Sequence, residues 1–129
     1  MNSENLSEFA KHYAKAWCSH NPETVVAFYA KNASISVNNG APAPIGDVAR
    51  GFMRDFPDMI VTFDELEPRG DRTAFHWTLT GTYARTGNHV RISGYELWKI
   101  DNDGLIAESE GHFDAAEYER QLKHGVEQL

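Results

Sequence analysis

The chain has 129 residues, of which 41% are hydrophobic and 12% aromatic, and its net charge is −7 with the histidines neutral. These totals are typical of one globular domain over residues 1–129 and exclude a disordered tail. The excess of 19 acidic over 12 basic residues disfavours nucleic acid and anionic membrane surfaces as partners, because both bind clustered positive charge.

The N-terminal residues show no charged-then-apolar signal segment, and no stretch approaches the roughly 20 apolar residues of a membrane span. The single cysteine, Cys18, excludes an internal disulfide framework and falls in a helical pattern as a small apolar side chain. We therefore expect a cytoplasmic protein.

The first half of the chain reads as helical. Apolar residues recur at helical spacing over residues 6–17, 22–29 and 48–56, which predicts three helices. A short strand is expected at residues 33–37, and the Asn, Gly and Pro residues of 38–44 predict a loop after it.

After Pro57 the hydrophobic pattern changes from helical to alternating. Four long strands are predicted at residues 59–67, 72–83, 90–100 and 105–113. The turns between them are short and rich in Gly, Asn and Asp, which favours antiparallel hairpins. A final short helix is expected from Ala115.

Helices followed by a meander of strands indicate an α+β domain. We expect a cone-shaped, strongly curved antiparallel sheet wrapped around the three N-terminal helices. A pocket would then form at the open end of the cone.

The stretch VRISGYELWKI, residues 90–100, places a carboxylate on an otherwise apolar strand face. Alternation puts Glu96 on the same face as Ile92 and Trp98. Burial would favour its neutral form and raise its pKa, as suits a general acid or base near neutral pH. The alternative is structural: Glu96 accepts hydrogen bonds from Tyr or Trp side chains or pairs with Arg50 or Arg54.

The faces of the neighbouring strands predict the walls of this cavity. In the strand after Arg72, the aromatic residues Phe75 and Trp77 should point at the helices. In the last strand we expect an inward face of small and apolar residues, and a bulge would reverse this parity. The inward set is Leu105, Ala107, Ser109, Gly111 and Phe113, and the outward set is Ile106, Glu108, Glu110 and His112.

A second acidic candidate, Asp114, begins the final helix. Glu117 stands three residues later, as in a capping box, and Phe113 and Tyr118 occupy hydrophobic-staple positions. A carboxylate at a helix N-terminus is favoured in its charged form, so Asp114 would serve as a base, assisted by His112, or act only as a cap. The six histidines show no HxH or HExxH spacing, so no metal site is predicted.

Several strings resemble the nuclear-transport-factor-2-like superfamily, and within it the SnoaL-like polyketide cyclases. They are FPD at 56–58, GDRTAFHWTLTGTY at 70–83, SGYELWKI at 93–100 with DGLIAES at 103–109, and FDAAEYERQL at 113–122. The resemblance implies a cone-shaped sheet with an apolar pocket and a homodimer formed through the outer sheet face.

The resemblance also assigns roles to the acidic residues. Cyclases of this type use an acidic residue at the end of the last strand without a cofactor, and Asp114 holds that position. Ketosteroid isomerases of the same fold place a carboxylic acid on the penultimate strand, near Glu96. Their base after the second helix would fall near Val37, where this chain has no carboxylate.

We therefore predict a pocket for an apolar small molecule, with cofactor-free isomerisation or aldol-type cyclisation of a carbonyl compound. The alternative is a non-catalytic ligand-binding or dimerisation module. The catalytic candidates are Asp114, Glu96 and His112. The predicted substrate-binding residues are Tyr13, Trp17, Phe52, Phe56, Phe75, Trp77, Tyr83, Trp98 and Phe113.

Overall fold

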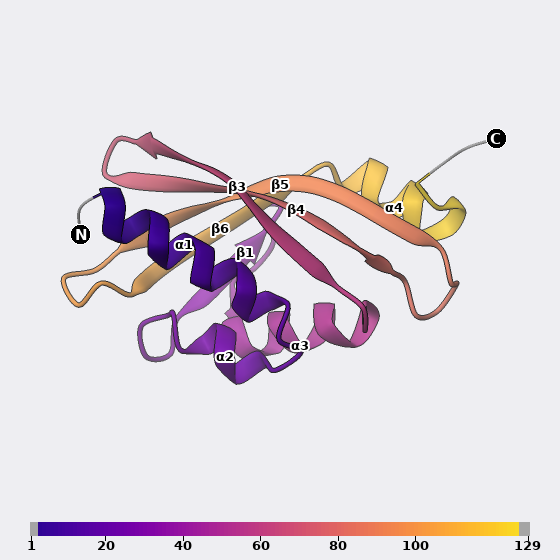
Figure 1. Ribbon diagram of the computed structural model, residues 1–129, viewed down its shortest axis with the longest axis horizontal. Helices are drawn as coiled ribbons and strands as arrows, with labels where there is room; N and C mark the ends of the chain where they lie inside the picture. The colour runs from indigo at the N-terminus through magenta and orange to yellow at the C-terminus, as the bar shows by residue number, and fades with distance from the viewer. Residues whose placement is uncertain (1–2, 127–129) are drawn as a thin grey trace.

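A computed structural model describes residues 3–126, which form four helices and one sheet of six strands (Figure 1). No helix among the described residues is both long and apolar enough to cross a membrane. The helices are α1 (Ser3–Trp17), α2 (Pro22–Val26), α3 (Ile45–Asp55) and α4 (Ala115–His124). The strands are β1 (Ser34–Val37), β2 (Ala43–Pro44), β3 (Ile60–Arg69), β4 (Arg72–Thr82), β5 (His89–Ile100) and β6 (Ile106–Phe113).

The sheet has the order β2-β1-β6-β5-β4-β3. The four long strands form the predicted antiparallel meander, because short turns join each strand to the next. β1 instead lies parallel to β6, with Ile35 beside Ser109 and Val37 beside Gly111. The α+β fold is confirmed, but the sheet is mixed rather than wholly antiparallel.

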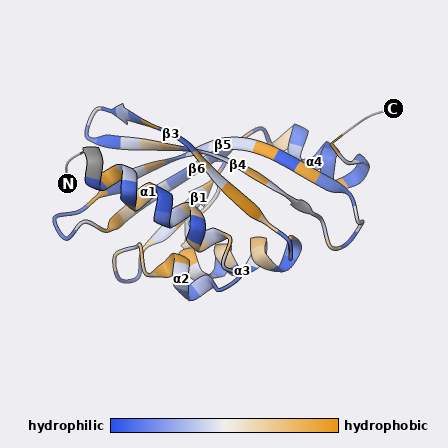
Figure 2. Ribbon diagram, viewed as in Figure 1, coloured by the Kyte–Doolittle hydropathy of each residue, from blue (hydrophilic) through white to orange (hydrophobic). Residues whose placement is uncertain are grey.

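The helices α1, α2 and α3 lie on one side of the twisted sheet, and α4 lies at its far end (Figure 1). Apolar segments of the strands and helices face one another in this arrangement (Figure 2). The core between them is aromatic: Phe75 stacks on Trp98 with ring centroids 4.8 Å apart, and Tyr13 meets Trp98 edge-on at 5.1 Å. The alternation predicted for β5 is confirmed, since Ile92, Glu96 and Trp98 are all buried.

One outward assignment was wrong at the start of β6. Ile106 was expected to face outward, yet it is fully buried. The pairing explains this, because Lys99 pairs with Glu108 while Ile100 pairs with Ile106, which leaves one extra residue on β6. This bulge reverses which side chains point inward, but only for the residues of β6 that precede it. Beyond the bulge, the inward faces of Ser109, Gly111 and Phe113 agree with the prediction.

The outer face of the sheet carries a row of rings across three strands. Tyr95 on β5 lies between His76 on β4 and His112 on β6, with ring centroids 5.6 and 5.0 Å away. The guanidinium of Arg69 lies 4.7 Å from the centre of the Tyr95 ring. The homodimer expected through this face stays a prediction.

Candidate functional site

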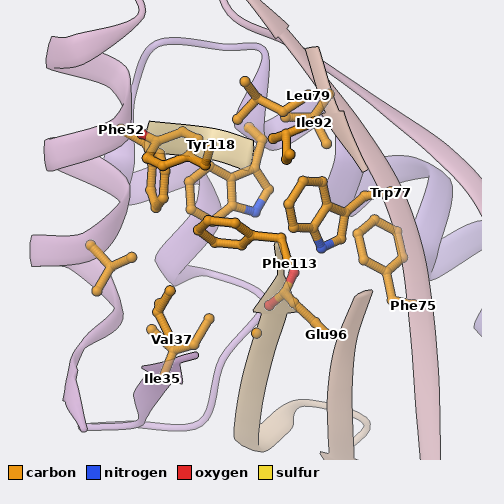
Figure 3. A pocket seen from close by; sticks show the side chains of 14 residues that line it. Ile35, Val37, Phe52, Phe75, Trp77, Leu79, Ile92, Glu96, Phe113 and Tyr118 are labelled. Carbon is orange, nitrogen blue, oxygen red and sulfur yellow. The ribbon is translucent and has the colours of Figure 1, made fainter. Parts of the chain in front are cut away.

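An apolar pocket lies between the inner face of the sheet and the helices α1, α3 and α4 (Figure 3). The cavity volume is about 60 Å³, or about 580 Å³ when the solvent-filled mouth is included. Such a pocket suits a small ligand. Its walls are Trp17, Ile35, Val37, Val48, Phe52, Val61, Phe75, Trp77, Leu79, Ile92, Glu96, Gly111, Phe113 and Tyr118.

Glu96 is the only acidic residue of these walls, and its carboxyl points toward Phe113 in the pocket (Figure 3). One of its oxygens, Oε1, meets three hydroxyl groups. Tyr13 Oη donates to Oε1 at 2.9 Å and Tyr29 Oη at 3.0 Å. Ser109 Oγ donates to the same oxygen at 2.9 Å. The two tyrosine oxygens are 2.8 Å apart, so either tyrosine can donate its one proton to the other instead of to Glu96.

Three separate parts of the chain deliver these hydroxyls. Tyr13 lies on the buried stripe of α1, and Ser109 lies on β6 beside Trp98 of β5. Tyr29 follows α2 and is fixed by its backbone neighbours. Ala30 N donates to Ile106 O at 2.8 Å, and Ile106 N donates to Phe28 O at 2.9 Å. The bulge that buries Ile106 therefore also positions Tyr29.

The protein environment raises the pKa of Glu96 above that of an ordinary glutamate. The largest cause is burial, which leaves the side chain 5% exposed and penalises its charged form. The hydroxyls of Ser109, Tyr13 and Tyr29 oppose this by favouring the carboxylate, but they do not cancel it. Burial also raises the pKa of both tyrosines well above the usual value, so both remain neutral donors.

The second carboxyl oxygen of Glu96, Oε2, accepts no hydrogen bond from any residue the structure describes. The indole Nε1 of Trp98 is buried nearby and helps to favour the carboxylate, but it makes no hydrogen bond within the described chain. Hydroxyl groups surround Oε1 in the structure, so we assign the acid proton of the neutral form to Oε2. The arrangement presents a carboxylic acid donor to a largely apolar pocket.

The structure brings together five of the predicted substrate-binding residues, namely Trp17, Phe52, Phe75, Trp77 and Phe113, as pocket walls. Tyr13 lies behind the pocket as a partner of Glu96. Phe56, Tyr83 and Trp98 are not among the walls. Ser109 and Gly111 lie on the inward face, as predicted, but the hydrogen bond from Ser109 to Glu96 was not predicted. Sequence reasoning missed Tyr29, which no local pattern marks because its position depends on the bulge in β6.

The other two catalytic candidates lie away from Glu96. Asp114 is exposed and caps α4, since its Oδ1 accepts from Glu117 N at 3.1 Å. Its neighbour His112 faces the outer side of the sheet beside Tyr95. Neither residue is a wall of the pocket. The catalytic role predicted for these two residues stays a prediction, without a pocket contact to support it.

The structure supports a structural role for Asp114, as a helix cap, and for Glu96, as an acceptor of hydrogen bonds. Phe113 and Tyr118 meet as the predicted staple, with ring centroids 5.2 Å apart. Arg50 and Arg54 pair with Asp47 and Asp55 of α3. The partners of Glu96 are hydroxyl groups.

The described residues contain no group of three or more His, Cys, Asp or Glu side chains arranged to hold a metal ion. The polar groups on the pocket walls are the Glu96 carboxyl, the Tyr118 phenol and the indole N–H groups of Trp17 and Trp77. Burial, with Asp55 nearby, raises the pKa of Tyr118 to about 12, which keeps the phenol neutral near neutral pH.

The family assignment follows from the sequence together with this fold. The sequence model described as the SnoaL-like domain matches residues 9–109. The chain belongs to the SnoaL-like family. No curated protein matches the sequence significantly.

Solved structures share the SnoaL-like fold over nearly the whole chain. AclR, a proposed hydroxylase from Streptomyces galilaeus, has a TM-score of 0.80 at 14% identity, covering 99% of this chain and 87% of its own. A proposed SnoaL-like polyketide cyclase from a Jannaschia species has a TM-score of 0.78 at 13% identity, with coverages of 95% and 93%. IdmH, a proposed polyketide cyclase from Streptomyces antibioticus, has a TM-score of 0.74 at 22% identity, with coverages of 91% and 97%.

Replacing Asp114 by Ala should lower the free energy of unfolding by about 1 kcal/mol, because α4 loses its N-cap. Asp114→Asn is the matched control, since Asn caps a helix nearly as well as Asp. Urea denaturation of the three proteins measures this difference. A loss in the Asn variant equal to that in the Ala variant would contradict a capping role.

Replacing Glu96 by Gln should stabilise the protein increasingly as pH rises. Above the ordinary glutamate pKa of about 4.3, the folded protein keeps a proton that the unfolded chain releases, so wild-type stability falls as pH rises through the folded-state pKa. Gln keeps an acceptor for the three hydroxyls and does not titrate. Thermal melts from pH 4 to pH 9 measure the difference in Tm, and a difference independent of pH would contradict the raised pKa.

Proposed function

We propose that the chain binds an apolar carbonyl compound in this pocket and promotes its isomerisation or aldol-type ring closure by proton transfer through Glu96, without a cofactor. The observation that carries the proposal is that the two oxygens of the Glu96 carboxyl group have different surroundings. Oε1 is held by three hydroxyls, while Oε2 accepts no hydrogen bond within the described chain and Glu96 is a wall of the apolar pocket. A donor left unpaired in such a place favours a ligand that supplies an acceptor.

A carbonyl oxygen is the acceptor that best fits this donor. The neutral acid can donate from Oε2 to the carbonyl and stabilise the negative charge that develops on its oxygen. The aromatic walls, including Phe75, Trp77 and Phe113, exclude water and strengthen this hydrogen bond. The tyrosine and serine hydroxyls hold the carboxyl plane in place during the transfer.

Ring closure of a substrate in its enol form needs no group beyond this carboxyl. The electron pair of the enol double bond forms the new carbon–carbon bond to the carbonyl carbon, and the carbonyl π pair takes the proton from Glu96 Oε2. The enol O–H pair becomes a new carbonyl π bond, and its proton returns to Glu96. Proton count and electron count are unchanged, and Glu96 acts first as acid and then as base.

Binding without catalysis is the second candidate function. One observation favours it: among the described walls, only Glu96 and Tyr118 carry a titratable group, and the pKa of Tyr118 is about 12. The pocket thus lacks a second residue suited to remove a proton near neutral pH. In this case Glu96 would orient a carbonyl ligand through one hydrogen bond.

The names of structural neighbours support the first candidate at the level of reaction class. IdmH and the Jannaschia protein are both proposed polyketide cyclases, although their identity to this chain is only 22% and 13%. Fold alone does not fix a reaction, so the proposal depends on the placement of Glu96.

The test uses 1-indanone, a small aromatic ketone whose carbon next to the carbonyl exchanges its protons on enolisation. We expect wild-type protein to speed deuterium exchange at that carbon in D₂O, and Glu96→Gln to lose on the order of 10²-fold or more of this effect. Proton NMR of the ketone measures the exchange. Glu110→Gln makes the same chemical change outside the pocket walls and should leave the rate unchanged.

Each result separates the two candidates. Binding of 1-indanone by calorimetry without faster exchange would contradict catalysis and favour a binding pocket. Equal exchange rates for wild type and Glu96→Gln would remove Glu96 from the mechanism. Lack of any binding would contradict the carbonyl pocket itself.

A further inference from the structure

We infer that Gly111 is a specificity-determining residue. Because it has no side chain, it leaves a shallow space beside Glu96 that fits carbonyl compounds that are flat and unbranched beside the carbonyl. This inference rests on the proposed function, because it concerns the ligand atoms that lie next to Glu96. It names a narrower ligand class than an apolar carbonyl compound.

The strand register places Gly111 directly beside the carboxyl. Glu96 on β5 pairs with Gly111 on β6, and Gly111 lies opposite Val37 on β1. All three residues are walls of the pocket, so they form one row across its floor. The row has a carboxyl on one side, a branched apolar side chain on the other, and only backbone between them. We call the space over this backbone the Gly111 niche.

The backbone of Gly111 does not require glycine. Its φ lies outside the left-handed region, and an added Cβ would make ordinary contacts, 3.7 Å to Ile35 Cδ1 and 3.8 Å to Ser36 O. Gly94 on the neighbouring strand differs, because a Cβ there would collide with the His112 carbonyl oxygen and lie 2.8 Å from Trp77 Cζ2. Packing thus explains Gly94 but leaves the empty space at Gly111 unexplained.

The floor of the niche is also held firmly. Asn38 N donates to Gly111 O at 2.8 Å, and Asn38 Oδ1 accepts from Phe113 N at 2.9 Å. The backbone on which a ligand would rest is therefore tied to its neighbour strand, and interiors of this kind give way little to extra atoms. A methyl group added to the protein or to the ligand at this point would compete for the same space.

The shape of the niche determines which ligands fit. Gly111 and Val37 are the walls in register with Glu96, so we expect the carbon next to a bound carbonyl group to lie near them. A planar ring carbon there can lie on the exposed backbone, whereas a carbon bearing two methyl groups would press against Val37. We therefore expect the pocket to accept cyclic ketones with an unbranched neighbouring carbon and to reject their dimethylated counterparts.

The test compares 1-indanone with 2,2-dimethyl-1-indanone, which adds two methyl groups beside the carbonyl. Calorimetry with wild-type protein should give Kd values about tenfold or more apart, the usual effect of excess methyl groups in a tight pocket. Gly111→Ala should weaken 1-indanone binding by about tenfold. Val37→Ala should narrow the difference between the two ketones, because it widens the niche from its other side.

The matched control is Gly51→Ala on α3, which adds the same methyl group where nothing lies within 4 Å. Gly51 is not a wall of the pocket, so the Kd for 1-indanone should stay unchanged. Circular dichroism checks that Gly111→Ala folds, and if it does not, the wild-type and Val37→Ala comparisons still decide the question.

The outcomes separate this inference from the proposed function. If Gly111→Ala binds 1-indanone as well as wild type does, the role of the Gly111 niche is contradicted. The same holds if wild type binds both ketones equally. In either case the proposed carbonyl pocket is unaffected. If wild type binds neither ketone, the carbonyl pocket is overturned and the niche with it. Discrimination by wild type, weaker 1-indanone binding in Gly111→Ala, and a smaller difference between the two ketones in Val37→Ala would support both.

Discussion

A carboxyl group buried in an aromatic core is the constraint on which the rest of this structure depends. Glu96 is 5% exposed, so its charge or its acid proton must be accommodated by the fold rather than by water. Hydroxyls from Tyr13, Tyr29 and Ser109 meet one carboxyl oxygen at 2.9 to 3.0 Å. Because these donors come from α1, the segment after α2, and β6, the position of Glu96 depends on the whole domain being folded.

The same constraint shapes the pocket. The hydroxyls occupy only Oε1, and the carboxyl group is a wall of the apolar space between the sheet and α3. The parallel pairing of β1 with β6 completes the floor by placing Val37 beside Gly111, next to Glu96. A buried carboxyl donor, a backbone floor and aromatic walls are the elements from which recognition of a flat carbonyl ligand would be built.

Alternation along residues 90–100 was enough to predict that Glu96 is buried, because a long central strand alternates without interruption. The hydrophobic pattern likewise predicted the meander and most of the aromatic walls. The role of Tyr29 and the orientation of Ile106 were not predictable, since both depend on a bulge that pairing alone reveals. Strand β1 has four residues, and four residues do not reveal which neighbour they pair with.

The most direct test of this chemistry is the pKa of Glu96 in the free protein. Carbon-13 NMR of glutamate-labelled protein, with the signal assigned by its loss in Glu96→Gln, follows this carboxyl as pH changes. We predict titration above the ordinary range, and a further rise in Tyr13→Phe, which removes a hydrogen bond that favours the carboxylate. Titration at or below the ordinary glutamate pKa of about 4.3 would contradict a carboxyl group held as an acid inside the pocket.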